Sequence, residues 1–409
     1  MTGHEHRPAV VFGAGNVGCG ILAGQLAQVS PVVMVTRTPA AADQLQQGRV
    51  RVRHVGGPAR PEAVVRPTDA IAIGDTAVVV DQIRHASVVV LAVGARGYAA
   101  VAPVLAAGLM TRRSPVNVLV CDNGDRAAAR VRALVAEHGD DRVLAHGFVG
   151  ALVDRIVTRD ERADGVRILQ AEARGRVYLD AHALRAPLAG TDRMRLVESF
   201  RAYLLRKLFV FSAGHAAAAY LGEVRGHRLL AEAMADEEVS TLVEAVMREG
   251  QAGLSACFGD RFAGGEAYVG QAVRRFAEPG LADTVERVGR DPWRKLAAHD
   301  RICGPARLAT AGGAATPALS VVAAAALRSA AADPHLCGLP TRSIVATLAR
   351  HAGLAPRHPF VARTLAASDL LTAGTSPAAV LSALSVPSEE SSGPVRSLAG
   401  VEARRTVDR

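Results

Sequence analysis

Short apolar runs alternate with longer helical stretches through the first part of the chain. Nearly continuous, β-branched runs of this kind indicate strands of a parallel sheet that is covered on both faces. The predicted strands are Ala9–Phe12, Val32–Thr36, Ala70–Ile73, Val88–Val93 and Val116–Cys121, with another near Arg142–Val149. Two further runs, Val166–Ala173 and Arg176–Asp180, predict an antiparallel extension that closes the domain.

From about Thr191 the apolar positions follow helical spacing, and strand signals nearly vanish. The predicted helices are Arg193–Leu208, His215–Leu221, His227–Gly253 and Glu266–Arg275, then alanine-rich helices from Pro317 to about Leu384. The fold class is therefore α/β, with an N-terminal Rossmann-like doubly wound sheet over residues 1–190 and a C-terminal all-helical domain over 191–384. The polar residues 385–409, with Ser, Gly and Pro, predict a disordered tail.

The composition excludes several classes of protein. The 409 residues are 49% hydrophobic and 21% charged, which is a globular balance. No apolar run approaches the ~18 to 20 residues of a membrane span, and the first residues carry no export signal, so we expect a cytoplasmic protein. Five scattered cysteines without a C-x-x-C pair indicate reduced thiols and no metal site.

The net charge of +9 does not indicate nucleic-acid binding. The arginines are scattered and aromatic residues form only 4% of the chain, so basic stripes and stacking platforms are absent. An anionic small molecule, such as a phosphorylated substrate, fits the charge better. Only two of the basic residues, Lys207 and Lys295, are lysines. Because arginine keeps its proton whereas a desolvated lysine can lose it, both lysines are candidates for chemistry.

A glycine-rich turn follows the first predicted strand. It has the spacing G-x-G-x-x-G, and a helix is predicted over Ile21–Gln28. The glycines allow a tight turn, the approach of a pyrophosphate to the backbone, and close packing of helix on strand, while the helix N-terminus offers free N–H groups. Because the motif stands at a strand–helix junction, it predicts that a dinucleotide binds here. The binding residues expected from the turn are Gly13, Gly15, Asn16, Val17 and Gly18.

The choice between NAD and NADP stays open. An NAD site usually has an Asp or Glu at the end of the second strand, where this chain has Thr36-Arg37-Thr38. Without a carboxylate the 2′-phosphate of NADP is not repelled, and Arg37 is a candidate to bind it. Alternatively, Arg37 only stacks on adenine or is an exposed charge. We favour NADP for a coenzyme that exchanges freely, and NAD for one that is retained.

A second group of polar residues lies in a predicted helix of the second domain. At roughly 100° per residue, Lys207, Ser212 and His215 fall within a sector of about 140° and can face one cleft. Gly214 costs about 1 kcal/mol relative to alanine inside a helix, so we expect another element to pack closely there.

Seven segments, in order, resemble the long-chain mannitol (polyol) dehydrogenase family. They are GAGNVGCG, LAVG, CDNGDRA, GFVGALVDRIV, RKLFVFSAGHAAAAYLG, VERVGRDPWRKL and DRICGPA, and together they span residues ~10 to ~310, about three quarters of the chain. The resemblance implies a metal-independent oxidoreductase that transfers a hydride between NAD or NADP and a polyol or sugar phosphate, such as mannitol 1-phosphate and fructose 6-phosphate.

The resemblance also implies roles for individual residues. Lys207 matches the general base that takes the alcohol proton, and His215 matches the residue that orients the substrate oxygen. Asn123 matches an amide on the oxyanion side and beside the coenzyme. Val93 and Gly94, in the LAVG segment, match coenzyme-binding positions.

The chain departs from the family at two places. Ser212 stands where the family motif has an Asn, and Cys19 stands where the family usually has an Arg. Loss of one oxyanion donor can cost on the order of 3 kcal/mol if nothing replaces it. Ser212 therefore leaves open both the substrate and whether the net reaction is a redox reaction.

A third cluster contains arginine forks that suit phosphate oxygens. The resemblance places this region beside the substrate, whereas the alternative is a loop with solvated charges. The substrate-binding candidates are Arg290, Arg294, Lys295 and His299.

Three functions remain open. The first is hydride exchange with a polyol or sugar phosphate. The second is transient oxidation by a retained coenzyme, which drives elimination or epimerisation of a sugar or nucleoside. The third is a non-catalytic coenzyme sensor, which the presence of Lys207, Asn123 and His215 argues against. In each case we expect a small-molecule ligand and a monomer or homodimer, with neither nucleic acid nor membrane as partner.

Overall fold

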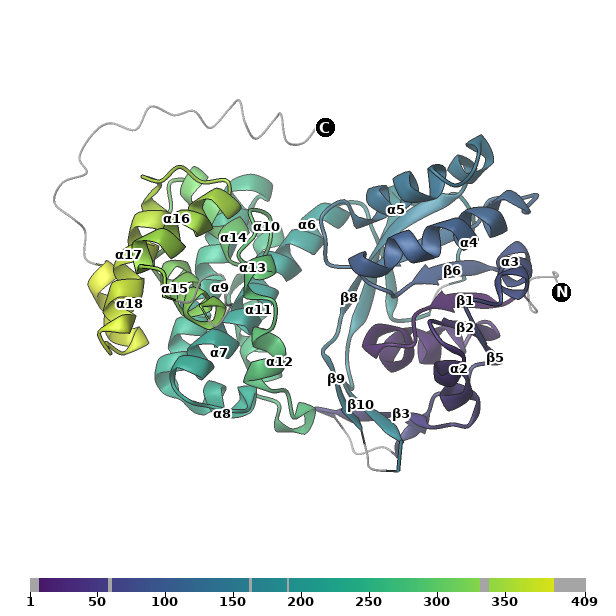
Figure 1. Cartoon of the computed structure of the whole chain (residues 1–409), viewed down its shortest axis with the longest axis horizontal. Helices are drawn as coiled ribbons and strands as arrows, with labels where there is room; N and C mark the ends of the chain where they lie inside the picture. Colours follow the sequence, from purple (N-terminus) through teal and green to yellow (C-terminus); the bar gives the residue numbers. More distant parts are fainter. Residues whose placement is uncertain (1–6, 58–60, 162–163, 190, 332–337, 386–409) are drawn as a thin grey trace. The chain divides into compact units, whose positions relative to one another are not determined.

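The computed structural model describes residues 7–57, 61–161, 164–189, 191–331 and 338–385. The chain divides into two compact units, Met1–Leu204 and Leu205–Arg409 (Figure 1). The boundary lies beyond the predicted residue 190 because β12 (Met194–Val197) pairs with β11 (Arg176–Asp180) in the sheet of the first unit. The predicted tail 385–409 lies, apart from Ser385, outside the described residues.

The first unit is built on an eight-stranded sheet of order β12-β11-β8-β7-β6-β1-β2-β5. Its six strands from β8 to β5 run parallel, and β11 runs antiparallel to β8, as the sequence predicted for the closing extension. The other strands of the sheet are β1 (Ala9–Phe12), β2 (Val32–Thr36), β5 (Asp69–Ala72), β6 (Val88–Leu91), β7 (Asn117–Cys121) and β8 (Gly147–Asp154). The apolar runs are therefore the central strands of a doubly wound sheet.

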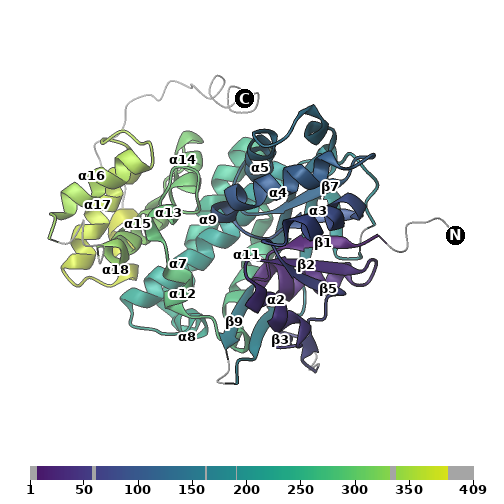
Figure 2. The same cartoon turned by 45° about the vertical axis from the view of Figure 1, so that its right-hand side comes forward.

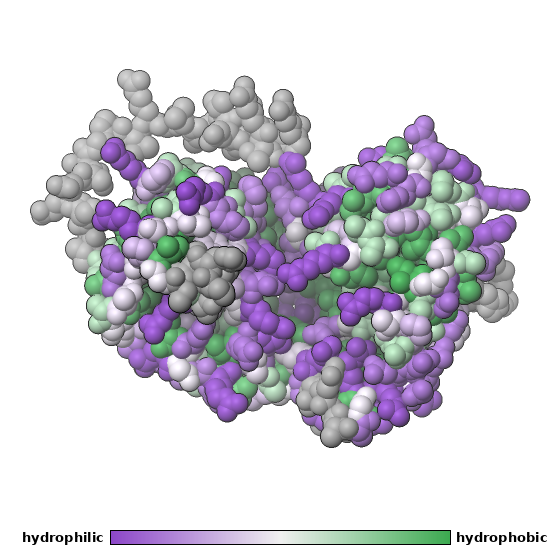
Figure 3. Space-filling model, in the orientation of Figure 1, coloured by the Kyte–Doolittle hydropathy of each residue, from purple (hydrophilic) through white to green (hydrophobic). Residues whose placement is uncertain are grey.

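Apolar cores lie on both faces of this sheet, which is why its strands are nearly continuously hydrophobic. Val10 and Phe12 join the core under three helices, while Ala9 and Val11 join the opposite core. The three helices are α3 (Thr76–His85), α4 (Tyr98–Met110) and α5 (Ala127–Ala136) (Figures 1 and 2). The opposite core contains residues of α2 (Pro39–Gln46) and of a second sheet. On the face drawn in Figure 3, apolar side chains gather over α4.

A second sheet, of order β4-β3-β10-β9, was not predicted. Its strands are β3 (Val50–Val55), β4 (Ala63–Val64), β9 (Val157–Glu161) and β10 (Arg167–Glu172). The run Val166–Ala173 was expected to extend the main sheet, but β10 pairs in parallel with β3 instead. The run VRVRHV in β3 alternates valine with arginine, which is the pattern of a half-buried strand, so the sequence carried a signal for β3 that is absent from the predicted strands. The predicted run Arg142–Val149 begins with a 3₁₀ turn, η3 (Asp141–Ala145), before β8 starts.

The second unit is helical throughout its described residues, as predicted. The helices not named elsewhere are α10 (Asp260–Ala263), α11 (Gly265–Phe276), α15 (Pro317–Ala330), α16 (Thr341–His351), α17 (Pro359–Thr372) and α18 (Pro377–Ser385). Ten residues of α7 (Ser212–Val224) and eleven of α15 are buried, so these two helices form much of its core. No helix among the described residues has the length and apolar character needed to cross a membrane.

Two predicted helices are wrong in their extent. The stretch Arg193–Leu208 is not a single helix. It contains the edge strand β12, and the helix α6 (Phe200–Arg206) begins after it. The stretch His227–Gly253 breaks into α8 (Leu230–Ala235) and α9 (Glu237–Phe258).

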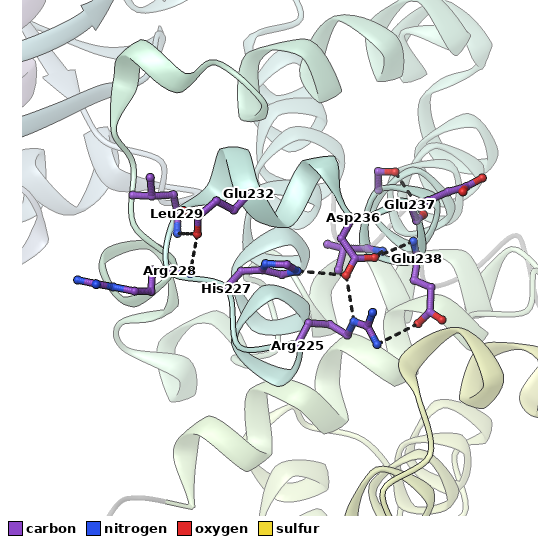
Figure 4. A network of polar contacts seen from close by, with 10 residues as sticks. Arg225, His227, Arg228, Leu229, Glu232, Asp236, Glu237 and Glu238 are labelled. Carbon is purple, nitrogen blue, oxygen red and sulfur yellow. Dashed lines mark hydrogen bonds and ion pairs between the residues drawn. The ribbon is translucent and has the colours of Figure 1, made fainter.

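Asp236 lies at the break between α8 and α9 (Figure 4). Its Oδ1 accepts the Glu238 N–H at 3.0 Å and caps α9, while its Oδ2 accepts hydrogen bonds from Arg225 at 3.0 Å and His227 at 3.1 Å. Burial raises the pKa of this carboxyl, but the hydrogen bonds from His227 and Arg225 outweigh burial and lower the pKa to about 2. A charged cap of this kind stabilises the start of α9.

Candidate coenzyme and catalytic sites

The glycine turn between β1 and the next helix has the close contacts that its motif requires. Gly13 has a φ of +103°, and a Cβ there would lie 2.5 Å from the Ala92 carbonyl oxygen. A Cβ on Gly18 would lie 1.9 Å from the Gly13 carbonyl oxygen. Gly15 is exposed, and a Cβ there would meet no atom within 4 Å. Two glycines thus shape the turn, and the third leaves open space over the backbone where a pyrophosphate fits.

The helix after this turn differs from the predicted Ile21–Gln28. A π-helical segment, η1 (Gly18–Ala23), is followed by one short α-helical turn, α1 (Gly24–Leu26). The early start places Gly20 against the second sheet, where a Cβ would lie 2.9 Å from Val157. The Asn16 amide donates to the Val157 carbonyl oxygen at 2.9 Å. Asn16 therefore ties the turn to β9, a contact that the glycine spacing did not indicate.

Five of the predicted coenzyme residues follow four neighbouring parallel strands. Gly13 follows β1, Arg37 follows β2, Val93 and Gly94 follow β6 after Ala92, and Asn123 follows β7. The carboxyl ends of these strands meet at one edge of the sheet, which is where open α/β sheets bind ligands. Arg37 and Asn123 are both exposed there. This edge, with open space over Gly15, fits a dinucleotide.

The catalytic candidates lie on an irregular helix. Lys207–Phe211 forms a π-helical turn, η5, between α6 and α7, and the Ser212 N–H donates to the Lys207 carbonyl, five residues back. The regular helix assumed from the sequence is therefore wrong at this point. A five-residue turn advances fewer degrees per residue than an α-helix, so Ser212 lies one turn beyond Lys207 instead of about 140° around the helix. Such turns occur frequently at functional sites.

Glycines on neighbouring helices make room for this turn. A Cβ on Gly250, in α9, would lie 2.2 Å from the Phe209 carbonyl oxygen, and a Cβ on Gly304, in α14 (Cys303–Ala311), would lie 2.6 Å from the Phe209 ring. Gly214 packs against Met247, which a Cβ would approach to 2.7 Å. Close packing at Gly214 was expected from the sequence, and it is confirmed.

His215 has an acidic partner that the sequence did not reveal. Its Nε2 lies 3.3 Å from Oδ2 of Asp283, a buried residue just before α12 (Val285–Gly289). The guanidinium of Arg287 donates to both oxygens of the same carboxylate, at 2.6 Å each. Burial raises the pKa of Asp283, but its contacts with His215 and Arg287 outweigh burial and lower the pKa to about 2. Asp283 is therefore ionised at neutral pH.

The imidazole of His215 packs beside a pair of aromatic rings. It stacks on Phe276 with ring centres 5.0 Å apart, and the Phe211 ring, 6.2 Å from the imidazole, contacts the Phe276 ring at 4.9 Å. Burial lowers the pKa of His215, against the raising effect of Asp283, so the ring is neutral at neutral pH. Among the described residues Nε2 has no partner in hydrogen-bond geometry, but the negative charge of Asp283 at 3.3 Å favours the tautomer with hydrogen on Nε2, which leaves the Nδ1 lone pair to accept a hydrogen bond.

The third predicted cluster divides in the structure. Lys295, in α13 (Pro292–Lys295), is only 3% exposed, and its Nζ lies 5.7 Å from the ring centre of Tyr220 in α7. Burial, then Arg301 and Arg294, lower the pKa of Lys295 to about 7.

The other three members are exposed. Arg294 pairs with Asp300 at 3.4 Å, and Arg290 lines a cavity of about 640 Å³ together with Glu223, Glu232 and Glu286. The described lining of that cavity includes neither Lys295 nor His299. Lys295 is thus the member of the cluster that lies against the catalytic helix α7.

The sequence carried one signal for the missed partners of His215. Asp283 and Arg287 stand four residues apart around a helix start, the spacing of a helical ion pair. Nothing in that spacing connects the pair to His215, which lies 68 positions earlier, so only the fold reveals the contact. Among the described residues, no three His, Cys, Asp or Glu side chains gather closely enough to hold a metal ion.

Comparison with known proteins agrees with both units. The profile of the Mannitol dehydrogenase Rossmann domain matches residues 7–183, and that of the Mannitol dehydrogenase C-terminal domain matches residues 199–334. Mannitol-1-phosphate 5-dehydrogenase of Brevibacillus brevis is 33% identical over 331 residues, which cover 78% of this chain and 85% of that protein.

Two solved structures share the fold. The ternary complex of Pseudomonas fluorescens mannitol 2-dehydrogenase with NAD and D-mannitol superposes with a TM-score of 0.77 at 18% identity, covering 93% of this chain and 94% of that one. Substrate-free D-sorbitol dehydrogenase gives a TM-score of 0.71 at 14% identity, covering 92% and 98%. The glycine turn, the two-unit fold and these matches show that the chain belongs to the mannitol dehydrogenase family and is a nicotinamide-dependent, polyol dehydrogenase-like oxidoreductase.

Proposed function

We propose that the enzyme interconverts a polyol phosphate and a keto-sugar phosphate, with mannitol 1-phosphate and fructose 6-phosphate as the substrate pair. The observation that carries the proposal is the placement of Lys207, Ser212 and His215 on one irregular helix with Asp283 behind the imidazole. The 33% identity to a mannitol-1-phosphate 5-dehydrogenase supports the phosphorylated substrate. The net positive charge of the chain agrees with an anionic ligand.

Three residues of the second unit have different roles toward the substrate hydroxyl. Lys207 takes the hydroxyl proton as general base, and returns it in the reverse direction. His215 stays neutral, because burial lowers its pKa, so it orients the oxygen through Nδ1 without competing for the proton. The charge of Asp283, 3.3 Å from Nε2, favours the tautomer that keeps Nδ1 free to accept. The glycine turn at Gly13, Gly15 and Gly18 would hold the pyrophosphate of the coenzyme, which when bound would accept or supply the hydride.

Steady-state kinetics in both directions test this proposal. We expect oxidation of mannitol 1-phosphate and reduction of fructose 6-phosphate to exceed the rates for unphosphorylated mannitol and fructose by at least about tenfold in kcat/KM, because a phosphate adds charge-assisted hydrogen bonds. Equal kcat/KM values for the phosphorylated and unphosphorylated sugars would overturn the phosphate assignment.

We propose that Arg37 selects NADP by binding its 2′-phosphate. Arg37 is exposed at the carboxyl end of β2, and the side chain of the neighbouring Thr38 accepts the Ala41 N–H to cap α2. We expect Arg37→Ala to raise the Kd of NADPH about tenfold and to leave the Kd of NADH within about twofold, as loss of one charged phosphate contact predicts. Arg84→Ala, another exposed arginine of the first unit, is the matched control. An equal effect of Arg37→Ala on both coenzymes would reduce Arg37 to stacking on adenine.

Ser212 favours a second candidate function, in which a retained coenzyme oxidises the substrate transiently before elimination or epimerisation. Ser212 is 6% exposed and its hydroxyl is shorter than the amide that the family carries. If the enzyme is a polyol-phosphate dehydrogenase, we expect Ser212→Asn to raise kcat/KM for mannitol 1-phosphate about tenfold or more, because it restores an amide donor. Ser212→Ala is the control that removes the hydroxyl. Absence of polyol-phosphate turnover in all three proteins would favour the second function.

A further inference from the structure

We propose that a cavity of the first unit, separate from the coenzyme turn, binds a small organic phosphate. The cavity has a volume of about 590 Å³ and lies between the second sheet and the segment formed by η1 and α1. Its walls come from Cys19–Gln28, from β3 and β4, and from the residues after β4 and β10. This volume lies in the range of sites for small metabolites.

The cavity stands at the opposite end of β2 from the coenzyme residues. Val32, the first residue of β2, lines it, whereas Arg37 follows the last residue of that strand. A five-residue strand separates its two ends by roughly 16 Å. None of the predicted coenzyme positions is among its lining residues. A ligand here therefore does not occupy the dinucleotide site.

The charge of the lining is strongly positive. Four arginines line the cavity, and no aspartate or glutamate does so among the described residues; the arginines are Arg66, Arg155, Arg174 and Arg193. Burial, and then the nearby charge of Arg193, lower the pKa of Arg155 to about 10.

The guanidinium of Arg155 forms its hydrogen bonds with neutral groups. Its guanidinium donates to the carbonyl oxygens of Glu172 and Gly20 and contacts Nδ1 of His54 at 2.8 Å. The carboxylate of Glu172 contributes to its electrostatics, but Oε2 of that group accepts the Ile156 N–H at 2.6 Å and Glu172 does not line the cavity. Burial raises the pKa of the Cys19 thiol to about 11, so the thiol is neutral and adds no negative charge.

Gln25 gives an independent sign of a ligand. Its side chain lines the cavity, is 4% exposed, and neither Oε1 nor Nε2 has a hydrogen-bond partner among the described residues. A buried amide without partners is costly, so such groups in proteins are generally satisfied. A ligand hydroxyl can donate to Oε1 and accept from Nε2, which would satisfy both atoms of this amide.

These features together define the class of ligand. Arginine forks match phosphate oxygens with paired hydrogen bonds, and several arginines suit a dianion. Apolar side chains, including Ile21, Val32 and Val52, line other parts of the cavity and suit a carbon skeleton. The combination of arginines, an unpartnered amide and apolar walls indicates a phosphate monoester of a small polar metabolite.

Titration calorimetry on the full chain tests the site, with the coenzyme site saturated by NADH or NADPH. The probes are 3-phosphoglycerate and inorganic phosphate. We expect saturable binding of 3-phosphoglycerate, and we expect Arg174→Gln and Arg193→Gln each to weaken it at least about tenfold, because each removes a charged contact. Gln25→Leu is expected to bring the affinity for 3-phosphoglycerate close to that for inorganic phosphate, since the amide contacts the organic part.

The matched control is Arg176→Gln, two residues along the chain from Arg174. Arg174 and Arg176 are both exposed, but only Arg174 lines the cavity. Binding by the Arg176→Gln variant should stay within about twofold of the unmodified protein, as expected for a surface charge. Absence of saturable binding up to about 10 mM, or equal binding by the Arg174, Arg193 and Arg176 variants, would overturn the proposal. Neither result bears on hydride transfer, which is assayed separately.

Discussion

Lys207→Ala is expected to lower kcat by about a thousandfold while leaving the Kd of the coenzyme nearly unchanged. The reason is that we propose Lys207 as the base that removes the proton of the reacting hydroxyl, and a positioned base contributes rate enhancements of this order. The coenzyme residues lie in the first unit, whereas Lys207 lies in the second, on the π-helical turn. Steady-state kinetics and coenzyme titration monitored by fluorescence measure the two effects separately.

Two further variants sharpen this prediction. Lys207→Arg keeps the positive charge but cannot release its proton, so it should be as inactive as Lys207→Ala. Lys295→Met removes the other lysine, which is buried beside Tyr220 and has a pKa lowered to about 7. If Lys295→Met abolished turnover and Lys207→Ala retained activity within tenfold of the unmodified enzyme, the base would be Lys295.

Asp283→Asn is expected to lower kcat about a hundredfold or more, again without a change in coenzyme affinity. The charge of the carboxylate, 3.3 Å from Nε2, favours a hydrogen on that atom of His215, whereas an asparagine amide facing Nε2 favours the other tautomer. In a catalytic triad, the same exchange leaves the geometry intact and greatly reduces turnover. Asp283 acts through His215, so it is a positioning residue. Nitrogen NMR of histidine-labelled protein should detect the change of tautomer at His215.

The molecule contains its own matched control for Asp283. Asp236 also contacts a histidine Nε2 and an arginine, at 3.1 Å and 3.0 Å, but its partners His227 and Arg225 have no part in the proposed site. Asp236→Asn should lower the melting temperature, since it weakens the cap of α9, and leave kcat within about twofold below that temperature. Asp283→Glu should recover part of the lost activity. Equal kcat values for the Asp283→Asn and Asp236→Asn variants would contradict a positioning role.

The doubly wound sheet could be predicted from the sequence because its strands are buried on both faces. Val10, Phe12 and their neighbours form continuous apolar runs that have no other stable place in a soluble fold. The glycine turn was predictable for a related reason, since Gly13 and Gly18 leave no space for a Cβ. Such features are local, so the chain displays them in a few consecutive residues.

The features that escaped prediction depend on residues far apart in the chain. β3 pairs with β10, more than a hundred residues later, and its local alternation of valine and arginine does not reveal this partner. Asp283 meets His215 only when α12 packs near α7. The π-helical turn at Lys207–Phe211 depends on the space that Gly250 and Gly304 leave on other helices. Helical periodicity alone assumes regular turns, so it could not reveal this one.

The π-helical turn also affects how this helix should be aligned with straight ones. Its backbone hydrogen bond joins residues five positions apart, whereas that of an α-helix joins residues four positions apart. The turn therefore holds one additional residue, and the helices before and after it keep the same relative orientation. A straight helix that presents the same two side chains would show a one-residue gap between the positions of Lys207 and Ser212. Deleting one residue from Leu208–Phe211 would therefore shorten the motif yet keep its two ends on the same side. The spacing between a lysine and its helical neighbours in such enzymes reflects the type of turn as well as the face of the helix.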